Sequence, residues 1–228
     1  MSDDERLVDT ARRLSSALTP GDLDHTLSQI TAAAVEVLPG VTHASITISH
    51  ADGTLDTAAP TDKLIEILDA AQYRLHQGPC YEAATETLHI ASPNLAADER
   101  FPDYAAIAVA AGIRAQAAVR LFDTGKSKGA LNLYSPNVGS FEDLAILSRL
   151  FAHQAAAVIG YANEIQTLRE AVNTRSSIGQ AVGILMERYK LNDHRAFAFL
   201  TRLSQQRNVK LRLIADQIND TVELQDGG

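Results

Sequence analysis

The sequence predicts an α+β protein in which an antiparallel sheet with helices on one side is followed by a long helix and a small helical bundle. Segments with an apolar period near 3.6 alternate with period-2 segments before residue 135. No proline interrupts residues 141–189, and apolar stripes at helical spacing recur up to Ile218. A chain of 228 residues is comfortable for two small domains. We expect a sheet domain over 1–163 and a helical domain over 164–228, with the connecting helix, about 142–189, shared between them.

Each element of the first domain is predicted from a change of period. A helix over 6–18 is followed by a break at Thr19–Asp22 and a second helix over 23–38. Ala44, Ile46 and Ile48 alternate with polar residues and predict a strand that ends at the hairpin turn Ala51–Thr54. The remaining expected elements are a helix over 61–75, a strand over 88–92, a helix over 104–111, and two antiparallel strands over 115–122 and 129–134.

The composition excludes several classes of protein. Hydrophobic residues make up 46% and charged residues 21%, and no apolar run approaches the roughly 18 residues that span a membrane. The acidic start, Met1–Glu5, is unlike a secretory signal, so we expect a cytoplasmic protein. Cys80 is the only cysteine, which excludes an intramolecular disulfide. His76, four residues before Cys80, could share a metal ion with it, but no third ligand is evident. We expect neither a metal nor a cofactor.

The charge is distributed unevenly along the chain. Residues 1–163 carry 11 Lys and Arg against 20 Asp and Glu, a balance of −9, whereas residues 173–215 carry 8 against 2, a balance of +6. A basic segment on an acidic protein favours a polyanionic partner for that segment, although a solvated helical surface has a similar pattern.

The long helix carries a heptad pattern. Its a positions are all apolar, and two of its d positions, Leu147 and Leu168, are leucines. The a positions are Leu144, Phe151, Val158, Ile165 and Val172. We expect the first half to pack on its own sheet. The second half is predicted to pair with the same helix of a second subunit, because little of the domain remains to cover it.

Three segments of the first domain resemble a GAF domain of the bacterial regulator kind, over roughly residues 20–160. They are the run Gln77–Ala83, the turn Asp98–Pro102 and the strand Lys128–Tyr134. The resemblance implies a small-molecule pocket or a dimerisation unit. For a pocket, the candidate residues are Cys80, Glu82, Phe122 and Tyr134, each of which has a structural alternative.

The second domain, over residues 164–220, resembles an ANTAR domain. The matching residues are Thr174–Arg188, Ala196 and Phe197 with Leu200, and Ser204 with Asn208–Arg212 and Ala215. The resemblance implies a dimeric three-helix RNA binder that acts in transcription antitermination by holding paired RNA hairpins. Val182 stands where the family usually has a lysine, which puts the affinity in doubt. The candidate RNA-binding residues are Arg175, Gly183, Arg188, Arg202, Ser204, Asn208, Lys210 and Arg212.

Two other classes of function could use the same sequence features. A ligand-responsive helix-turn-helix DNA binder would also be a small basic helical module, but no glycine joins the last two predicted helices, where only Asn208-Val209 lies between the stripes. An enzyme is not expected, because the sequence has no Gly-rich phosphate loop, nucleophile elbow or His-Glu-x-x-His motif, and no catalytic residue is proposed.

Overall fold

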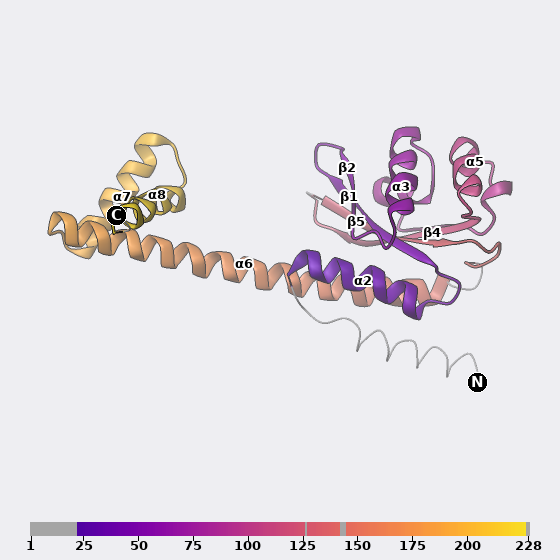
Figure 1. Ribbon diagram of the computed structural model, residues 1–228, viewed down its shortest axis with the longest axis horizontal. Helices are drawn as coiled ribbons and strands as arrows, with labels where there is room; N and C mark the ends of the chain where they lie inside the picture. The colour runs from indigo at the N-terminus through magenta and orange to yellow at the C-terminus, as the bar shows by residue number, and fades with distance from the viewer. Residues whose placement is uncertain (1–21, 126, 142–144, 227–228) are drawn as a thin grey trace. The chain divides into compact units, whose positions relative to one another are not determined.

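The computed structural model describes residues 22–125, 127–141 and 145–226, and the chain divides into two compact units, 1–163 and 164–228. Figure 1 draws both units. The helix predicted over 6–18 lies outside the described residues. None of the helices in the described ranges is long and apolar enough to cross a membrane.

The first unit is built on a five-stranded antiparallel sheet with the strand order β2-β1-β5-β4-β3. The central strands β4 and β5 pair as predicted, with Ala117 opposite Leu133 and a bulge between Arg120 and Phe122. The strands are β1 (His43–His50), β2 (Leu55–Ala58), β3 (His89–Ser92), β4 (Ala115–Asp123) and β5 (Ser127–Ser135). The predicted α+β class is confirmed.

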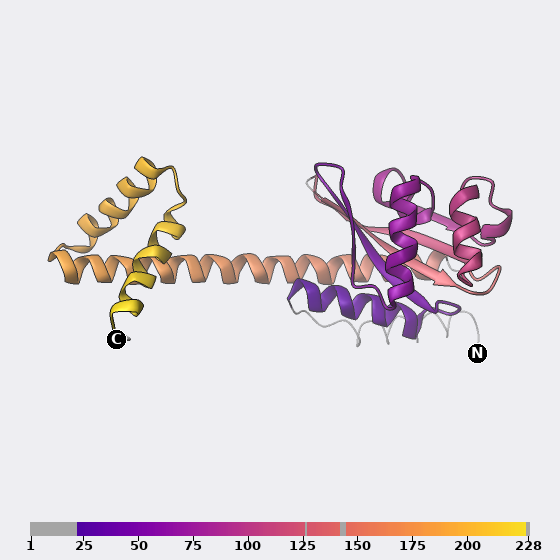
Figure 2. The same ribbon diagram turned by 45° about the horizontal axis from the view of Figure 1, so that its top comes forward.

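Helices cover both faces of the sheet, which differs from the one-sided arrangement expected from the sequence (Figures 1 and 2). One face packs against α2 (Leu23–Val37) and the first part of α6 (Ala145–Tyr189). The other face packs against α3 (Lys63–Leu75), α4 (Pro79–Thr85) and α5 (Pro102–Ala110), with the short 3-10 helix η1 (Leu95–Ala97) beside them. The central strands explain the difference, because both faces of β4 and β5 are buried.

The two faces have different chemistry. On the α2 and α6 side, Ile46, Leu131 and Leu133 contact apolar residues such as Ile30 and Phe151. On the α3 and α4 side, the alternate positions of the same strands carry buried polar residues, among them Ser45, Thr47, Gln116, Asn132 and Tyr134. Alternation of side chains along a strand therefore separates an apolar layer from a partly polar one.

Helix α4 was not predicted, because Gly78-Pro79 looks like a break. Gly78 has φ +117°, a backbone conformation that favours glycine, and Pro79 follows at the first turn of the helix, where its missing N–H is no loss. The pair thus starts a seven-residue helix that carries Cys80 into the interior.

The second unit consists of the C-terminal part of α6 with α7 (Asp193–Arg207) and α8 (Leu211–Asp226). The side chain of Asn192 caps α7 by accepting a hydrogen bond from the Arg195 N–H at 2.9 Å. The core is small and rich in alanine, which lets the helices approach closely; its buried members are Ala181, Leu185, Ala196, Leu200, Ile214 and Ala215.

Candidate nucleic-acid interface and buried polar cluster

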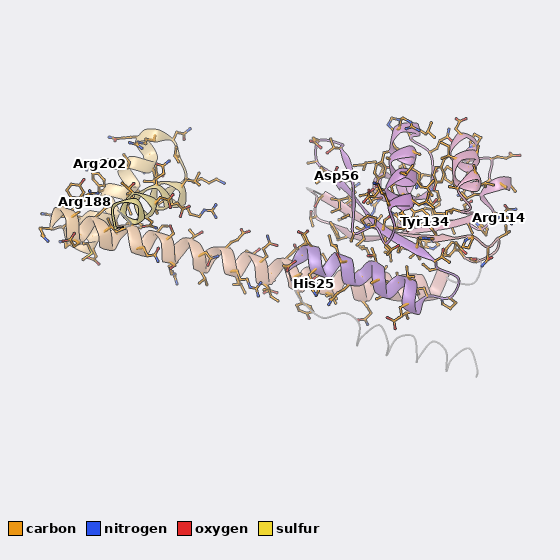
Figure 3. The ribbon with its side chains drawn as sticks, in the orientation of Figure 1. His25, Asp56, Arg114, Tyr134, Arg188 and Arg202 are labelled. Carbon is orange, nitrogen blue, oxygen red and sulfur yellow. The ribbon has the colours of Figure 1, made fainter. Side chains whose placement is uncertain are left out.

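Five polar side chains are buried together between the sheet and helices α3, α4 and α5 of the first unit, and we call them the buried polar cluster. The Cys80 Sγ atom lies 3.0 Å from the Tyr134 Oη atom and 2.8 Å from the Gln116 Nε2 atom. The Gln72 amide donates to the same sulfur at 3.0 Å, and the Tyr134 hydroxyl donates to the Asp69 carboxylate. Figure 3 labels Tyr134 in the interior of this unit.

Burial controls the ionisation of this cluster. Burial raises the pKa of Asp69 to about 6, although hydrogen bonds from Tyr134 and Ser45 lower it in part. Burial and the negative charge of Asp69 raise the pKa of Cys80 and that of Tyr134 well above their usual values. The thiol and the phenol are therefore protonated at neutral pH, and the charge of Asp69 changes near pH 6.

Gly78 and Gln72 fit together in a way that fills the interior. The Gln72 Oε1 atom accepts a hydrogen bond from the backbone N–H of Cys80 at 3.0 Å. A Cβ atom at Gly78 would lie 2.1 Å from that oxygen, so only glycine leaves room for the Gln72 amide. The amide thus occupies space beside Cys80, where we expected a ligand.

The four candidate pocket residues do not lie together. Cys80 and Tyr134 are in contact within the buried polar cluster. Glu82 is on α4 and partly exposed, and partial burial raises its pKa. Phe122 packs against the apolar cluster on the α2 and α6 face, and a Cβ atom at Gly129 would lie 2.2 Å from its ring.

Three members of the cluster were missed by the sequence analysis: Asp69, Gln72 and Gln116. Gln116 gave a signal, because it is the one uncharged polar residue within the strand segment Ala115–Val119. Asp69 and Gln72 lie on an amphipathic helix, where polar residues are ordinary, so only the packing of α3 on the sheet identifies them.

In the second unit, the predicted arginine and lysine contacts are on the surface. Arg175, Arg188, Arg202, Lys210 and Arg212 are all exposed. Figure 3 labels Arg188 and Arg202 in the helical bundle. Arg175 borders an open groove of about 570 Å³ between α6 and α7, which Ile178 and Phe197 also line.

The N-terminus of α8 carries positive charge where a helix favours negative charge. The Lys210 carbonyl accepts the first hydrogen bond of the helix, from the Leu213 N–H at 2.9 Å, and Arg212 lies in the first turn, which holds no acidic residue. Among the described residues, Asp216 is the one carboxylate within ion-pair distance of Arg212, at 3.9 Å. Cations at this end oppose the helix dipole, and with the free N–H groups they create a region favourable for anions.

The connection between α7 and α8 is tight and uses both predicted hydrogen-bonding residues. Asn208 ends α7 in the left-handed conformation at φ +51°, the conformation a glycine would supply. The Ser204 hydroxyl donates to the Val209 carbonyl at 2.6 Å, and the Val209 N–H donates to the Ser204 carbonyl at 3.1 Å. In the sequence alone, the absence of glycine argues against a helix-turn-helix. Because Asn208 supplies the left-handed conformation, that absence does not distinguish this connection from a helix-turn-helix.

A polar contact attaches α8 to α6 within the second unit. The Ser177 hydroxyl donates to the Asp216 carboxylate at 2.5 Å, and the Asn219 amide donates to the Ser177 carbonyl at 3.1 Å. Val182 is half-buried against the bundle core, whereas Gly183 is exposed and faces open space. The bundle thus places the backbone at Gly183 on its surface.

The predicted dimer helix is covered in its first part and exposed in its second. Phe151 is buried against the sheet and Val158 is partly buried there, while Leu144 lies outside the described residues. Ile165 is half-buried. Leu168 is 59% exposed and Val172 is 67% exposed.

Comparison with solved structures identifies the fold of the first unit. A free methionine-R-sulfoxide reductase from Neisseria meningitidis, in complex with its substrate, is 18% identical, with a TM-score of 0.53 over 72% of this chain and 95% of that one. The GAF domain of a phosphoenolpyruvate-protein phosphotransferase from Coxiella burnetii is 15% identical, with a TM-score of 0.53 over 73% and 99%. A bacteriophytochrome from R. palustris is 16% identical, with a TM-score of 0.55 over 81% and 43%. At these identities the likeness concerns the fold, which is that of a GAF domain.

Family models give the more specific result. A GAF domain model matches residues 21–159, more than half of the chain, and an ANTAR domain model matches residues 166–218. The chain therefore belongs to the GAF-domain family and carries an ANTAR domain after it. Both domains are of regulatory types. No curated protein matches the chain.

Proposed function

We propose that this protein is a bacterial transcription antitermination regulator whose ANTAR domain binds paired RNA hairpins under the control of the GAF domain. The observation that carries the proposal is the position of Lys210 and Arg212 at the N-terminus of α8. Cations there cost helix stability, about 0.3–1 kcal/mol each, so an anionic partner is a physical reason for their presence. The +6 balance of residues 173–215 supports the same partner.

The proposed RNA face combines charge with backbone access. Phosphates are expected at Arg175, Arg188, Arg202, Lys210 and Arg212, and a close backbone approach at Gly183. Ser204 and Asn208 stabilise the α7–α8 connection, so we expect them to hold Lys210 in position. The Asn208 side-chain amide is exposed and is the group that we expect to contact a base. Val182, half-buried where the family usually has a lysine, leaves the remaining cations to supply affinity.

Dimerisation is part of the proposal. Leu168 and Val172 expose apolar area on α6, and at roughly 100° per residue they lie on a different side of the helix from Ala181 and Leu185, which face the bundle core. A second copy of the helix would cover both residues. Two copies would also present two RNA faces, which suits a target with two hairpins.

Control by the GAF domain is proposed to act through the buried polar cluster. A small molecule that entered this interior would have to replace hydrogen bonds among Gln72, Cys80 and Gln116, so a small polar compound is the fitting class. A regulator that acts on nascent transcripts works in the cytoplasm, which is where we place this protein. We propose no reaction for either domain.

A ligand-responsive helix-turn-helix DNA-binding regulator is the alternative. The tight α7–α8 connection, with Asn208 in the left-handed conformation, favours it more than the sequence did. Duplex DNA would then bind at least as well as hairpin RNA.

One binding experiment tests both functions. Full-length protein is titrated with a two-hairpin RNA, a loop-scrambled RNA of equal stem length and a duplex DNA, across a salt series. We expect the two-hairpin RNA to bind most tightly, and each of Lys210→Ala and Arg212→Ala to reduce the salt slope by about one. Lys210→Glu separates binding from folding, because it should weaken RNA binding while keeping or slightly raising thermal stability. Equal affinity for all three nucleic acids would defeat the proposal, and preference for duplex DNA would favour the alternative.

A further inference from the structure

Two exposed aromatic rings lie together on the surface of the second unit. Tyr189, at the end of α6, is 59% exposed, and Phe199, on α7, is 47% exposed. Their ring centroids are 6.4 Å apart, with the ring planes tilted by 32°. Burial of an aromatic side chain contributes a large favourable free energy. A half-exposed aromatic pair is therefore a surface whose burial would stabilise a complex with a partner.

Arginines border this pair. Arg195 lies four residues before Phe199 and Arg202 three residues after it, so all three project from the same side of α7. Both arginines are exposed, and within the described part of the second unit no carboxylate forms an ion pair with either. The surface therefore offers flat apolar rings between two uncompensated positive charges.

We propose that Tyr189 and Phe199 form a stacking platform for an unpaired RNA base, with Arg195 and Arg202 contacting the phosphates on either side. The proposal rests on RNA binding by the second unit and adds where base recognition occurs. Unpaired bases in RNA loops are bound by stacking on aromatic rings and on arginine planes, and their phosphates by cations. Neither aromatic residue nor Arg195 was among the sequence-predicted contacts.

The arginines favour RNA over a second copy of the chain as the partner. In a two-fold symmetric contact centred on the rings, Arg195 and Arg202 of one copy would face the same residues of the other. Like charges brought together in this way oppose association, whereas phosphates neutralise them.

Phe197 provides a matched control for Phe199. It lies on the same helix and is 48% exposed, against 47% for Phe199. Two residues correspond to roughly 200° around a helix, so the two rings project from opposite sides. Phe197 lines the groove beside Ile178 instead of contacting Tyr189.

The test compares Phe199→Leu with Phe197→Leu in the full-length protein. Leucine keeps apolar contact and helix propensity but cannot stack on a base. We expect Phe199→Leu to weaken binding of the two-hairpin RNA about 5- to 100-fold. The salt slope should be unchanged, because the variant loses a base contact and keeps every phosphate contact. Phe197→Leu alters the groove beside Arg175 and leaves the platform intact, so it should weaken binding much less than Phe199→Leu does.

A fluorescence measurement adds a direct readout, because the chain contains no tryptophan. In Phe199→Trp, RNA should quench the single tryptophan by stacking, and an RNA with an abasic site in the loop should quench it much less. Phe197→Trp should give the same small response to both RNAs, because residue 197 does not contact the loop base. Quenching at residue 197 instead of 199, or equal quenching by the abasic RNA, would overturn the platform.

The remaining outcomes separate this proposal from the proposed function. If Lys210→Ala weakens binding and Phe199→Leu does not, RNA binding stands and the platform is wrong. If the wild type binds no RNA, both fail. If Phe199→Leu instead lowers the molar mass in light scattering, the rings serve a protein contact and the platform is again wrong.

Discussion

Asp69 shows how the burial of one ionisable side chain affects stability. Its carboxylate accepts hydrogen bonds from the hydroxyls of Tyr134, Ser45 and Thr57, yet burial still raises its pKa from 3.8 to about 6. A pKa above that of the unfolded chain means that folding favours the protonated acid. The carboxyl group therefore contributes stability that is fully present below about pH 4 and is lost as pH rises through about 6.

Asp69→Asn should remove this pH dependence, because the amide keeps an acceptor for Tyr134 but cannot ionise. Relative to wild type, the variant should gain stability between pH 4 and pH 7.5, by on the order of 3 kcal/mol for the roughly two-unit pKa difference. Urea unfolding at both pH values measures the change. Glu66→Gln, at an exposed position on the same helix, is the control and should follow wild type. Parallel curves for wild type and Asp69→Asn would contradict the expected ionisation.

The two glycines in the second-unit part of helix α6, Gly179 and Gly183, have no packing reason to be glycine. A Cβ atom at Gly179 or Gly183 would meet nothing within 4 Å. Alanine stabilises a helix interior by up to about 1 kcal/mol relative to glycine, so both positions give up stability. A close approach of RNA to the backbone would account for this at Gly183.

Gly183→Ala and Gly179→Ala are therefore expected to separate stability from binding. Both substitutions should raise the melting temperature by similar amounts, since both add a methyl group in open space. Only Gly183→Ala should weaken binding of the two-hairpin RNA, because its methyl group would stand between the helix and the ligand. Calorimetry and RNA titration measure the two effects. Unchanged binding by Gly183→Ala would remove this residue from the proposed interface.

The elements also show what sequence periodicity can and cannot predict. The strands from Ala115 and from Gly129 were predicted within two residues, because alternation of side chains is a local property. Helix α4 was missed, because the dipeptide Gly78-Pro79 is compatible both with the end of a helix and with its beginning. Helices on the second face of the sheet were missed because burial of a strand on both sides depends on packing from distant segments.

The candidate sites were predictable to different extents for the same reason. The basic residues of the second unit are exposed, as charge alone suggests. The interior of the first unit depends on contacts such as that of Cys80 with Gln116, 36 positions apart, which no local pattern contains. The roles of Ser204 and Asn208 in the α7–α8 connection likewise follow from backbone geometry.

The exposed apolar residues of α6 bear on how many copies of the whole molecule act together. Each unit has its own core, and α6 belongs to both. Within the second unit, Leu168 and Val172 are exposed apolar residues four positions apart, at d and a of the heptad pattern. Apolar side chains at these positions are buried when two helices pair in register. Their substitution should change the folding stability of a single chain only slightly, because they are exposed there.

Leu168→Glu combined with Val172→Glu should therefore convert a dimer into a folded monomer. The monomer exposes both side chains, so the substitutions should leave its thermal unfolding nearly unchanged, whereas two pairs of buried glutamates should cost the dimer several kcal/mol by desolvation and repulsion. Light scattering at tens of micromolar measures the mass. Asn173→Glu combined with Gln180→Glu adds the same charge at exposed positions on another side of the helix and should remain dimeric. The monomeric variant should also bind a two-hairpin RNA more weakly than the wild-type dimer does. In the dimer, the two RNA faces are linked, which raises the effective concentration for the second contact. A wild-type monomer, or a dimer that survives Leu168→Glu with Val172→Glu, would exclude this helix as the dimer contact.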